Sequence, residues 1–278
     1  MVIEKTSLDG SAKEIVDRLS GALQSQLVIP PRYSNKKLDI SEPDEHSKQI
    51  GLFSSGSTGT PKCIWNSFSN LWKNGERSAI AFQVESHHSL LILASPWHVA
   101  GLTWAFMAEA VDCDYLFITT KKGDHTTWLR CIQDFQPDYV FTVPAVLRAL
   151  YHEDWFVSNV VWGGASIQQK EYELIAPHCA TTFQGYGQTE AGGLIAVHRR
   201  KSTLIPEEDE HLCCGLPMNG VEIVCSGTRI HSEPVSIKSH TAYTDKLYST
   251  RDIGYKDGSG KLYLTGRLDA LERESKLV

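Results

Sequence analysis

A segment rich in glycine and hydroxyl side chains, "GLFSSGSTGTPKCIW" at residues 51–65, offers the clearest chemistry in this 278-residue chain. Nine Gly, Ser, Thr and Pro residues lead to one lysine, Lys62, and apolar stretches lie on both sides. Successive backbone N–H groups in such a loop can form an anion-binding nest, while hydroxyls and the lysine add donors and charge. The pattern suits a polyphosphate, although it is not the G-x-x-x-x-G-K-[ST] loop. From this segment alone, a surface hairpin turn is an equal alternative.

Composition and charge argue against several classes of partner. The formal net charge is −6 and the basic run at 198–201 is short, so no nucleic acid partner is expected. No stretch reaches about 18 uninterrupted apolar residues, and residues 1–10 lack an apolar signal-peptide core. We therefore expect a soluble, cytoplasmic protein with no membrane partner. The seven cysteines show no CxxC pair and no metal-ligand spacing, which predicts reduced, mostly buried thiols.

Short apolar runs alternate with helical patterns between residues 50 and 203. The expected strands are 50–53, 89–96, 114–120, 138–144 and 159–164, with helices at 70–82, 102–111, 127–135, 145–152 and 168–178. Strands that are apolar on both faces and separated by helices indicate an α/β fold, with a mostly parallel sheet covered by helices.

The two ends of the chain show sequence patterns that differ from those of this α/β region. Residues 11–27 have the pattern of an amphipathic helix, and residues 29–46 are polar and broken by proline, as in a surface arm. After about residue 203 short strands are expected at 220–225, 228–232, 235–239, 246–250 and 261–267. We expect three parts: an N-terminal helix and arm (1–49), an α/β core (50–203) and a small β-rich subdomain (204–278).

Six segments, in order along the chain, resemble the motifs of the adenylate-forming superfamily, in particular its acyl- and aryl-CoA ligases. They are "SSGSTGTPK" (54–62, phosphate loop), "SPWHVAGL" (95–102, beside the acyl pocket), "WGGASI" (162–167, near adenine), "QGYGQTE" (184–190), "YSTRDIG" (248–254, ribose aspartate) and "LTGRLDALE" (264–272, hinge). One short motif is weak evidence, whereas six in the family's order are specific. The resemblance assigns nucleotide and acyl binding to the core and ends the β-rich subdomain at the hinge.

The resemblance implies ATP-dependent activation of a small-molecule carboxylic acid to an acyl-adenylate, with release of pyrophosphate. It implies ATP and Mg²⁺ as cofactors, and CoA or a carrier-protein thiol as the acceptor. The residues that it marks as catalytic are Lys62, Thr189, Glu190, Arg267 and His98, with Glu190 as the Mg²⁺ ligand. Those that it marks as cofactor-binding are Ser54, Ser55, Gly56, Ser57, Thr58, Gly59, Gly164, Ala165, Gly185, Tyr186, Gly187 and Asp252.

Each implied role has a simpler structural alternative. Tyr186 would stack on adenine, yet it could be an ordinary core aromatic. Asp252 would accept hydrogen bonds from the ribose, yet it could cap a turn. Glu190 could be a carboxylate at a helix start, where acids are favoured. His98 would lie at the mouth of the acyl pocket, yet it could be a hydrogen-bonded core histidine.

The chain departs from the family's pattern at both ends. The phosphate loop starts near residue 54, earlier than in full-length relatives, and no residue matches the lysine of the family's C-terminal lid. Two hypotheses follow: a ligase core that acts alone or with a separate lid domain or carrier protein, and a binding module that holds nucleotide or acyl-adenylate without turnover. Aromatic residues in or near the acyl-pocket segments favour an aryl or arylalkanoic acid, with a fatty acid as the alternative. These residues are Trp97, His98, Trp104, Phe106 and Trp162.

Overall fold

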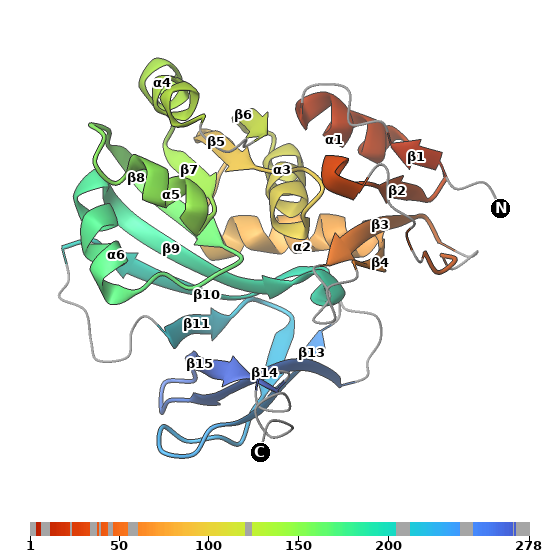
Figure 1. Ribbon diagram of the computed structural model, residues 1–278, viewed down its shortest axis with the longest axis vertical. Coiled ribbons are helices and arrows are strands. Elements are labelled where there is room, and N and C mark those ends of the chain that lie inside the picture. The colour runs from red at the N-terminus through yellow and green to blue at the C-terminus, as the bar shows by residue number, and fades with distance from the viewer. Residues whose placement is uncertain are drawn as a thin grey trace.

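Within the part of the chain that the structure describes, the strands form two sheets, one of four strands and one of eleven (Figure 1). This arrangement comes from a computed structural model. It describes residues 4–6, 12–22, 24–33, 38, 40–43, 47–54, 61–119, 124–203, 212–239, 247–268 and 270.

The four-stranded sheet is built from the N-terminal part of the chain. Its strands, in spatial order, are β1 (Glu4–Thr6), β2 (Gln26–Val28), β3 (Gln49–Ser54) and β4 (Lys62–Ser67). The first three strands are parallel, and β3 and β4 are antiparallel. Helix α1 (Ala12–Gly21) lies between β1 and β2 in the chain, and a 3₁₀ turn, η1 (Pro31–Tyr33), follows β2.

The helix predicted over residues 11–27 is too long. It ends at Gly21, and Gln26–Val28 form β2, which pairs with β3 and is fully buried. Tertiary strand pairing decides the conformation there, because a short apolar run fits a helix or a strand equally well.

Five parallel strands form one half of the eleven-stranded sheet, as the alternating pattern predicts. In spatial order they are β6 (Asp114–Thr119), β5 (Ser89–Ala94), β7 (Tyr139–Thr142), β8 (Val157–Gly163) and β9 (Cys179–Gln188). All four neighbouring pairs are parallel. Strand β5 is buried on both faces, which explains its continuous apolar run.

Helices cover both faces of this parallel region, so the predicted α/β class is confirmed (Figure 1). Helices α2 (Phe68–Phe82) and α3 (Val99–Val111) share one hydrophobic cluster with Phe141 and Phe183. Helices α4 (His125–Phe135), α5 (Pro144–Leu150) and α6 (Gln169–Ile175) share a second cluster with Val140 of β7 and Val160 of β8. The 3₁₀ turn η2 (Ala176–His178) leads from α6 into β9.

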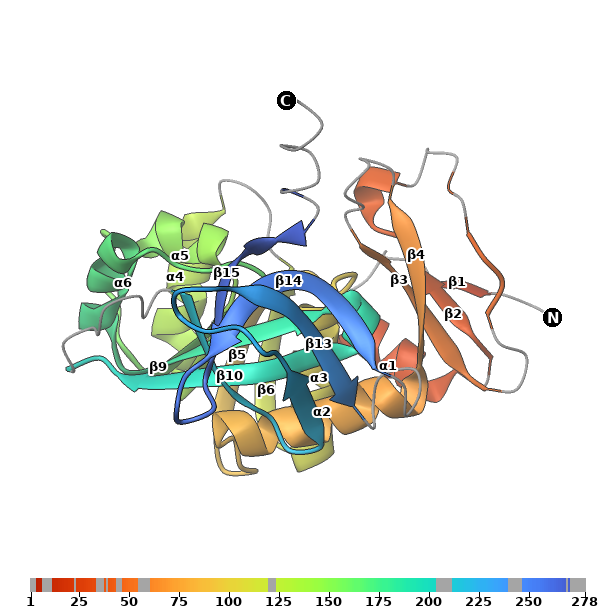
Figure 2. The same ribbon diagram turned by 90° about the horizontal axis from the view of Figure 1, so that it is seen from below.

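The other half of the large sheet is antiparallel and extends from β9 (Figure 2). Its strands, in spatial order, are β10 (Gly193–Lys201), β11 (Cys213–Pro217), β15 (Leu262–Arg267), β14 (Tyr248–Lys256), β13 (Glu233–Ser239) and β12 (Val221–Val224). The strand predicted at 228–232 is wrong. Thr228 and His231 exchange backbone hydrogen bonds of 2.7 and 3.1 Å there, which close a turn.

The predicted division at residues 49 and 203 separates segments that share sheets. Strands β2 and β3 pair on either side of residue 49, and β10 and β11 pair on either side of residue 203. The division into three domains therefore remains a prediction, because both sheets continue across its boundaries.

The prediction that the thiols are mostly buried is confirmed. All seven cysteines are free, and five of them are buried, while Cys131 and Cys225 are half-buried. Among the residues that the structure describes, no helix is long and apolar enough to cross a membrane.

Candidate active site

The structure brings Tyr186 and Gln188 of β9 against Thr250 and Asp252 of β14. Tyr186 and Gln188 are two apart on β9 and therefore share one face of that strand. The Tyr186 hydroxyl donates a hydrogen bond to Oδ2 of Asp252 at 2.5 Å, and Nε2 of Gln188 donates to the same oxygen at 2.7 Å. The same Gln188 nitrogen donates to the Thr250 carbonyl at 2.9 Å. Two segments more than sixty positions apart therefore meet at one carboxylate.

Arg267 completes this carboxylate cluster, which comprises Tyr186, Gln188, Asp252 and Arg267. The antiparallel register of β14 and β15 places Arg267 opposite Asp252, and its Nη1 donates to Oδ1 at 2.8 Å. The Asp252 side chain is 6% exposed, whereas that of Arg267 is 51% exposed. A buried carboxylate needs partners to offset its lost hydration, and these three donors supply them.

Burial and nearby negative charges raise the pKa of two tyrosines at the site, Tyr186 and Tyr248. Burial raises the pKa of the Tyr186 phenol far above its usual value, and the charge of Asp252 raises it further, so Tyr186 remains a donor. Burial also raises the pKa of Tyr248 to about 12, and the negative charge of Glu190 adds to this. The sequence analysis missed both Gln188 and Tyr248. Counting two residues along the strand from Tyr186 would have found Gln188.

Thr189 and Glu190 lie on a 3₁₀ turn, η3 (Thr189–Ala191), directly after β9. Both are half-buried. The buried Asn66 of β4 donates from Nδ2 to the Thr189 carbonyl at 3.1 Å. This bond ties the turn to the strand that begins at Lys62.

The backbone at the end of β8 lies beside the Tyr186 segment. Gly163 pairs with Gly185, and Gly164 has a φ of +86°, which favours glycine. Gly164 and Ala165 are exposed. A Cβ on Gly187 would lie only 2.3 Å from the Gly193 carbonyl oxygen, so the close approach of β10 explains the glycine at that position.

The described ends of the glycine-rich loop face each other. Ser54 pairs with Lys62 across β3 and β4, and Lys62 is exposed. Neither makes a hydrogen bond to the carboxylate cluster within the described ranges. The other predicted loop residues lie outside the described residues; they are Ser55, Gly56, Ser57, Thr58 and Gly59.

His98 is exposed and immediately precedes α3, so the alternative of a core histidine is wrong. Two of the aromatic residues expected near an acyl pocket are buried instead of exposed like His98. Phe106 is fully buried against Phe68 and Trp72. Trp104 is buried against Phe141.

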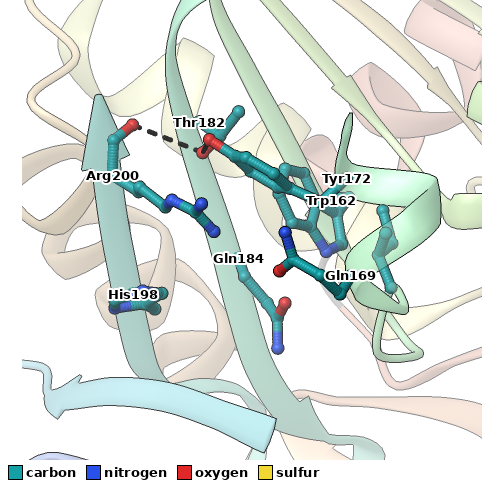
Figure 3. Close-up of a pocket in the computed structure, with 8 residues that line it drawn as sticks. Trp162, Gln169, Tyr172, Thr182, Gln184, His198 and Arg200 are labelled. Atoms are coloured by element: carbon teal, nitrogen blue, oxygen red, sulfur yellow. Dashed lines mark hydrogen bonds between the residues drawn. The ribbon is translucent and has the colours of Figure 1, made fainter. Parts of the chain in front are cut away.

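A small cavity lies between β9, β10 and α6, and Trp162 lines it (Figure 3). The Arg200 guanidinium carbon is 3.7 Å from the centroid of the Tyr172 ring, and Thr182 donates to the Arg200 carbonyl at 3.3 Å. Gln184 also lines the cavity, on the same face of β9 as Tyr186. None of the predicted catalytic or cofactor-binding residues is among those that line it.

Comparison with known families identifies the family of this chain. Residues 2–226 match the family model for AMP-binding enzymes. The chain belongs to this family. The resemblance found in its motifs is therefore confirmed.

Members of the AMP-binding family that resemble this chain include 2-succinylbenzoate–CoA ligases. The ligase of Bacillus licheniformis is 26% identical over 253 residues, which cover 82% of this chain and 50% of the relative. That of Listeria innocua is 24% identical over 305 residues, covering 96% and 61%. The chain thus spans about half to three fifths of the length of these curated relatives.

Solved AMP-binding structures share the fold. The o-succinylbenzoate coenzyme A synthetase of Bacillus subtilis, in complex with ATP and magnesium, superposes with a TM-score of 0.68 at 18% identity, covering 93% of this chain and 62% of that one. The N-terminal subdomain of Klebsiella oxytoca NpsA, in complex with 3-hydroxybenzoyl-AMSN, gives 0.69 at 17% identity, covering 93% and 79%.

A magnesium ion fits Glu190 of this AMP-binding chain. Within the described part of the chain, no three His, Cys, Asp or Glu side chains are grouped to hold a metal by themselves. Mg²⁺ does not need such a cage, because it commonly binds one or two carboxylates together with phosphate oxygens and water. The half-buried Glu190 carboxylate, on the turn tied to β4, offers such a ligand.

Proposed function

We propose that this chain binds ATP with Mg²⁺ and activates a carboxylic acid as an acyl-adenylate. The observation that carries the proposal is the carboxylate cluster at the carboxyl end of β9, where parallel sheets commonly bind ligands. The buried Asp252 supplies acceptors for ribose hydroxyls, and Gly185, next to Tyr186, pairs with Gly163 directly before the exposed Gly164 and Ala165.

The remaining predicted residues surround this nucleotide position. In our proposal, the adenine stacks on Tyr186 and the outer phosphates contact Lys62 and the loop that begins at Ser54. Thr189 donates to the α-phosphate, and Arg267 reaches the ribose or a phosphate. Family membership and the link from Asn66 to the Thr189 carbonyl support this arrangement, since the link joins the loop's strand to the turn.

The reaction requires orientation and charge compensation more than covalent chemistry by the protein. A carboxylate oxygen of the acid attacks the α-phosphorus, the bond to pyrophosphate breaks, and an acyl phosphate anhydride forms. Mg²⁺ on Glu190 supplies positive charge to the phosphates when bound. The exposed His98 would contact the acid near its carboxylate and help to exclude water.

We propose an aryl or arylalkanoic acid as the substrate and CoA or a carrier-protein thiol as the acceptor. Two comparisons support an aromatic acid: the succinylbenzoate ligases, and the NpsA subdomain with its 3-hydroxybenzoyl compound. Pyrophosphate release by these 278 residues alone should be slow, because none of them matches the lid lysine that the family uses for adenylation. Little thioester should form without a lid, because the family's rotated lid completes the site for the thiol. A lid domain added in trans should raise both.

Pyrophosphate release tests the activity. The chain is mixed with ATP, Mg²⁺ and one acid at a time from benzoate, 3-hydroxybenzoate, 2-succinylbenzoate, phenylpropanoate and octanoate. We expect acid-dependent release that is fastest with an aromatic acid and lost in Asp252→Ala. Tight ATP binding without release for any acid would favour a non-catalytic binding module, and preference for octanoate would contradict the aromatic substrate class.

Calorimetry tests the nucleotide position separately. Asp252→Ala should weaken binding of ATP and AMP alike, because both carry the ribose. Lys62→Ala should weaken ATP by about tenfold and AMP much less, because a charge-assisted hydrogen bond to an outer phosphate is lost. Equal losses for the two nucleotides in Lys62→Ala would refute the phosphate-loop assignment.

A further inference from the structure

Gln188 is well placed to control the carboxylate that would bind the ribose. We propose that Gln188 is a positioning residue: its amide holds Asp252 in one orientation when Arg267 leaves and the ribose hydroxyls arrive. This inference rests on the proposed nucleotide site. It adds to that site a residue whose side chain contacts Asp252 and not the nucleotide.

The hydrogen bonds of Gln188 define its orientation. Its Nε2 lies 2.7 Å from Oδ2 of Asp252 and 2.9 Å from the Thr250 carbonyl oxygen. Both neighbours are acceptors, so the nitrogen and not the amide oxygen must face them. An amide nitrogen carries two hydrogens, and here each has a partner. Because the Thr250 carbonyl belongs to the backbone of β14, Gln188 ties Asp252 to its own strand.

The Asp252 carboxylate does not have enough free acceptor sites for both ribose hydroxyls. A carboxylate has about four lone-pair sites, two on each oxygen. Tyr186 and Gln188 occupy Oδ2, and Arg267 occupies one site on Oδ1. Two neighbouring ribose hydroxyls need two sites, so one of the present donors must leave.

Arg267 is the donor that can leave at low cost. Its side chain is 51% exposed, so water can replace its bond to Asp252, and it is the last residue of β15. Gln188 and Tyr186 are half-buried and remain on Oδ2. Without Gln188, Asp252 would keep only the Tyr186 hydroxyl while Arg267 is away. A carboxylate buried to 6% exposure with one donor would lose its fixed orientation.

A near-isosteric pair of variants tests this role. Gln188→Met removes the amide and keeps the side-chain length. Gln184→Met is the matched control: it removes an amide from the same strand and face, and Nε2 of Gln184 donates to the Cys213 carbonyl at 3.2 Å instead of to Asp252. Calorimetry with each folded protein gives Kd for ATP and for 2′,3′-dideoxy-ATP, which lacks both ribose hydroxyls.

The ratio of the two dissociation constants is the decisive readout. Two hydrogen bonds to a charged acceptor should make the parent prefer ATP by a factor on the order of 100. In Gln188→Met that preference should fall about tenfold while the Kd for dideoxy-ATP stays unchanged, and Gln184→Met should keep the parent's ratio. Should Gln188→Met fail to fold, Gln188→Leu serves the same purpose, because its apolar side chain cannot donate.

Three results would overturn the positioning role. One is an unchanged ratio in both Gln188 variants. The second is an equal loss of affinity for both nucleotides, which marks a purely structural role. The third is the same fall in the Gln184→Met control. Failure of the proposed nucleotide site looks different, because the parent itself would then bind neither nucleotide or fail to distinguish them, and both proposals would fall.

Discussion

Asn74 offers a sharp test of how the fold holds the active-site strands. This residue of α2 is fully buried, and its side-chain amide makes two hydrogen bonds to the backbone of Leu194 in β10. Nδ2 donates to the Leu194 carbonyl and Oδ1 accepts from the Leu194 N–H, both at 3.0 Å. Leu194 pairs with Gly187, so Asn74 supports the strand that lies against the Tyr186 segment.

Asn74→Leu should be strongly destabilising. Leucine has a similar size but leaves the N–H and C=O of Leu194 buried without these partners. Each stranded group costs about 1–3 kcal/mol, so the free energy of unfolding should fall by about 2–6 kcal/mol. That is a large part of the roughly 5–15 kcal/mol by which proteins are stable. With a urea dependence of about 3 kcal/mol/M, the unfolding midpoint should drop by roughly 0.7–2 M.

Urea unfolding followed by tryptophan fluorescence and circular dichroism measures this midpoint. Asn70→Leu is the matched control, because Asn70 lies one turn earlier on the same helix, is half-buried and makes no comparable side-chain bond in the described chain. It should shift the midpoint by less than about 0.3 M, as ordinary surface substitutions do. An equally small shift for Asn74→Leu would refute the role given to its two hydrogen bonds.

Three further predictions follow from the packing. Gly215→Ala should lower the thermal midpoint by several degrees, because Gly215 has a φ of +79° and a Cβ there would lie 1.9 Å from the Val197 carbonyl oxygen. An aromatic disulfide reagent should modify Cys131 and Cys225 first in the native protein and all seven thiols in denaturant; rapid native modification of all seven would contradict the burial. Burial raises the pKa of Cys179 to about 12 from 9. The stabilising contribution of the buried thiol is therefore complete below pH 9 and is lost as the pH rises from 9 to 12. The urea midpoint should decline over this range, and Cys179→Ala should make the decline smaller.

Local patterns in the sequence determined the fold class and the family. The continuous apolar runs of β5 and β7 predicted buried parallel strands because burial on both faces leaves no polar alternation. The six ordered motifs predicted the AMP-binding family, which the family model confirms. Both inferences depend on residues that are close in the chain, where composition and spacing carry the information.

Only the tertiary structure decided which residues meet at the site. The long β9 and β10 hairpin was not predicted, because the glycine-rich "QGYGQTE" segment has no clear strand alternation. The contact between Gln188 and Asp252 spans 64 positions and depends on how β14 is placed against β9, which no local pattern encodes. The same limit applies to Phe106. Its aromatic character fitted an acyl pocket equally well, and packing against Phe68 and Trp72 placed it in the core.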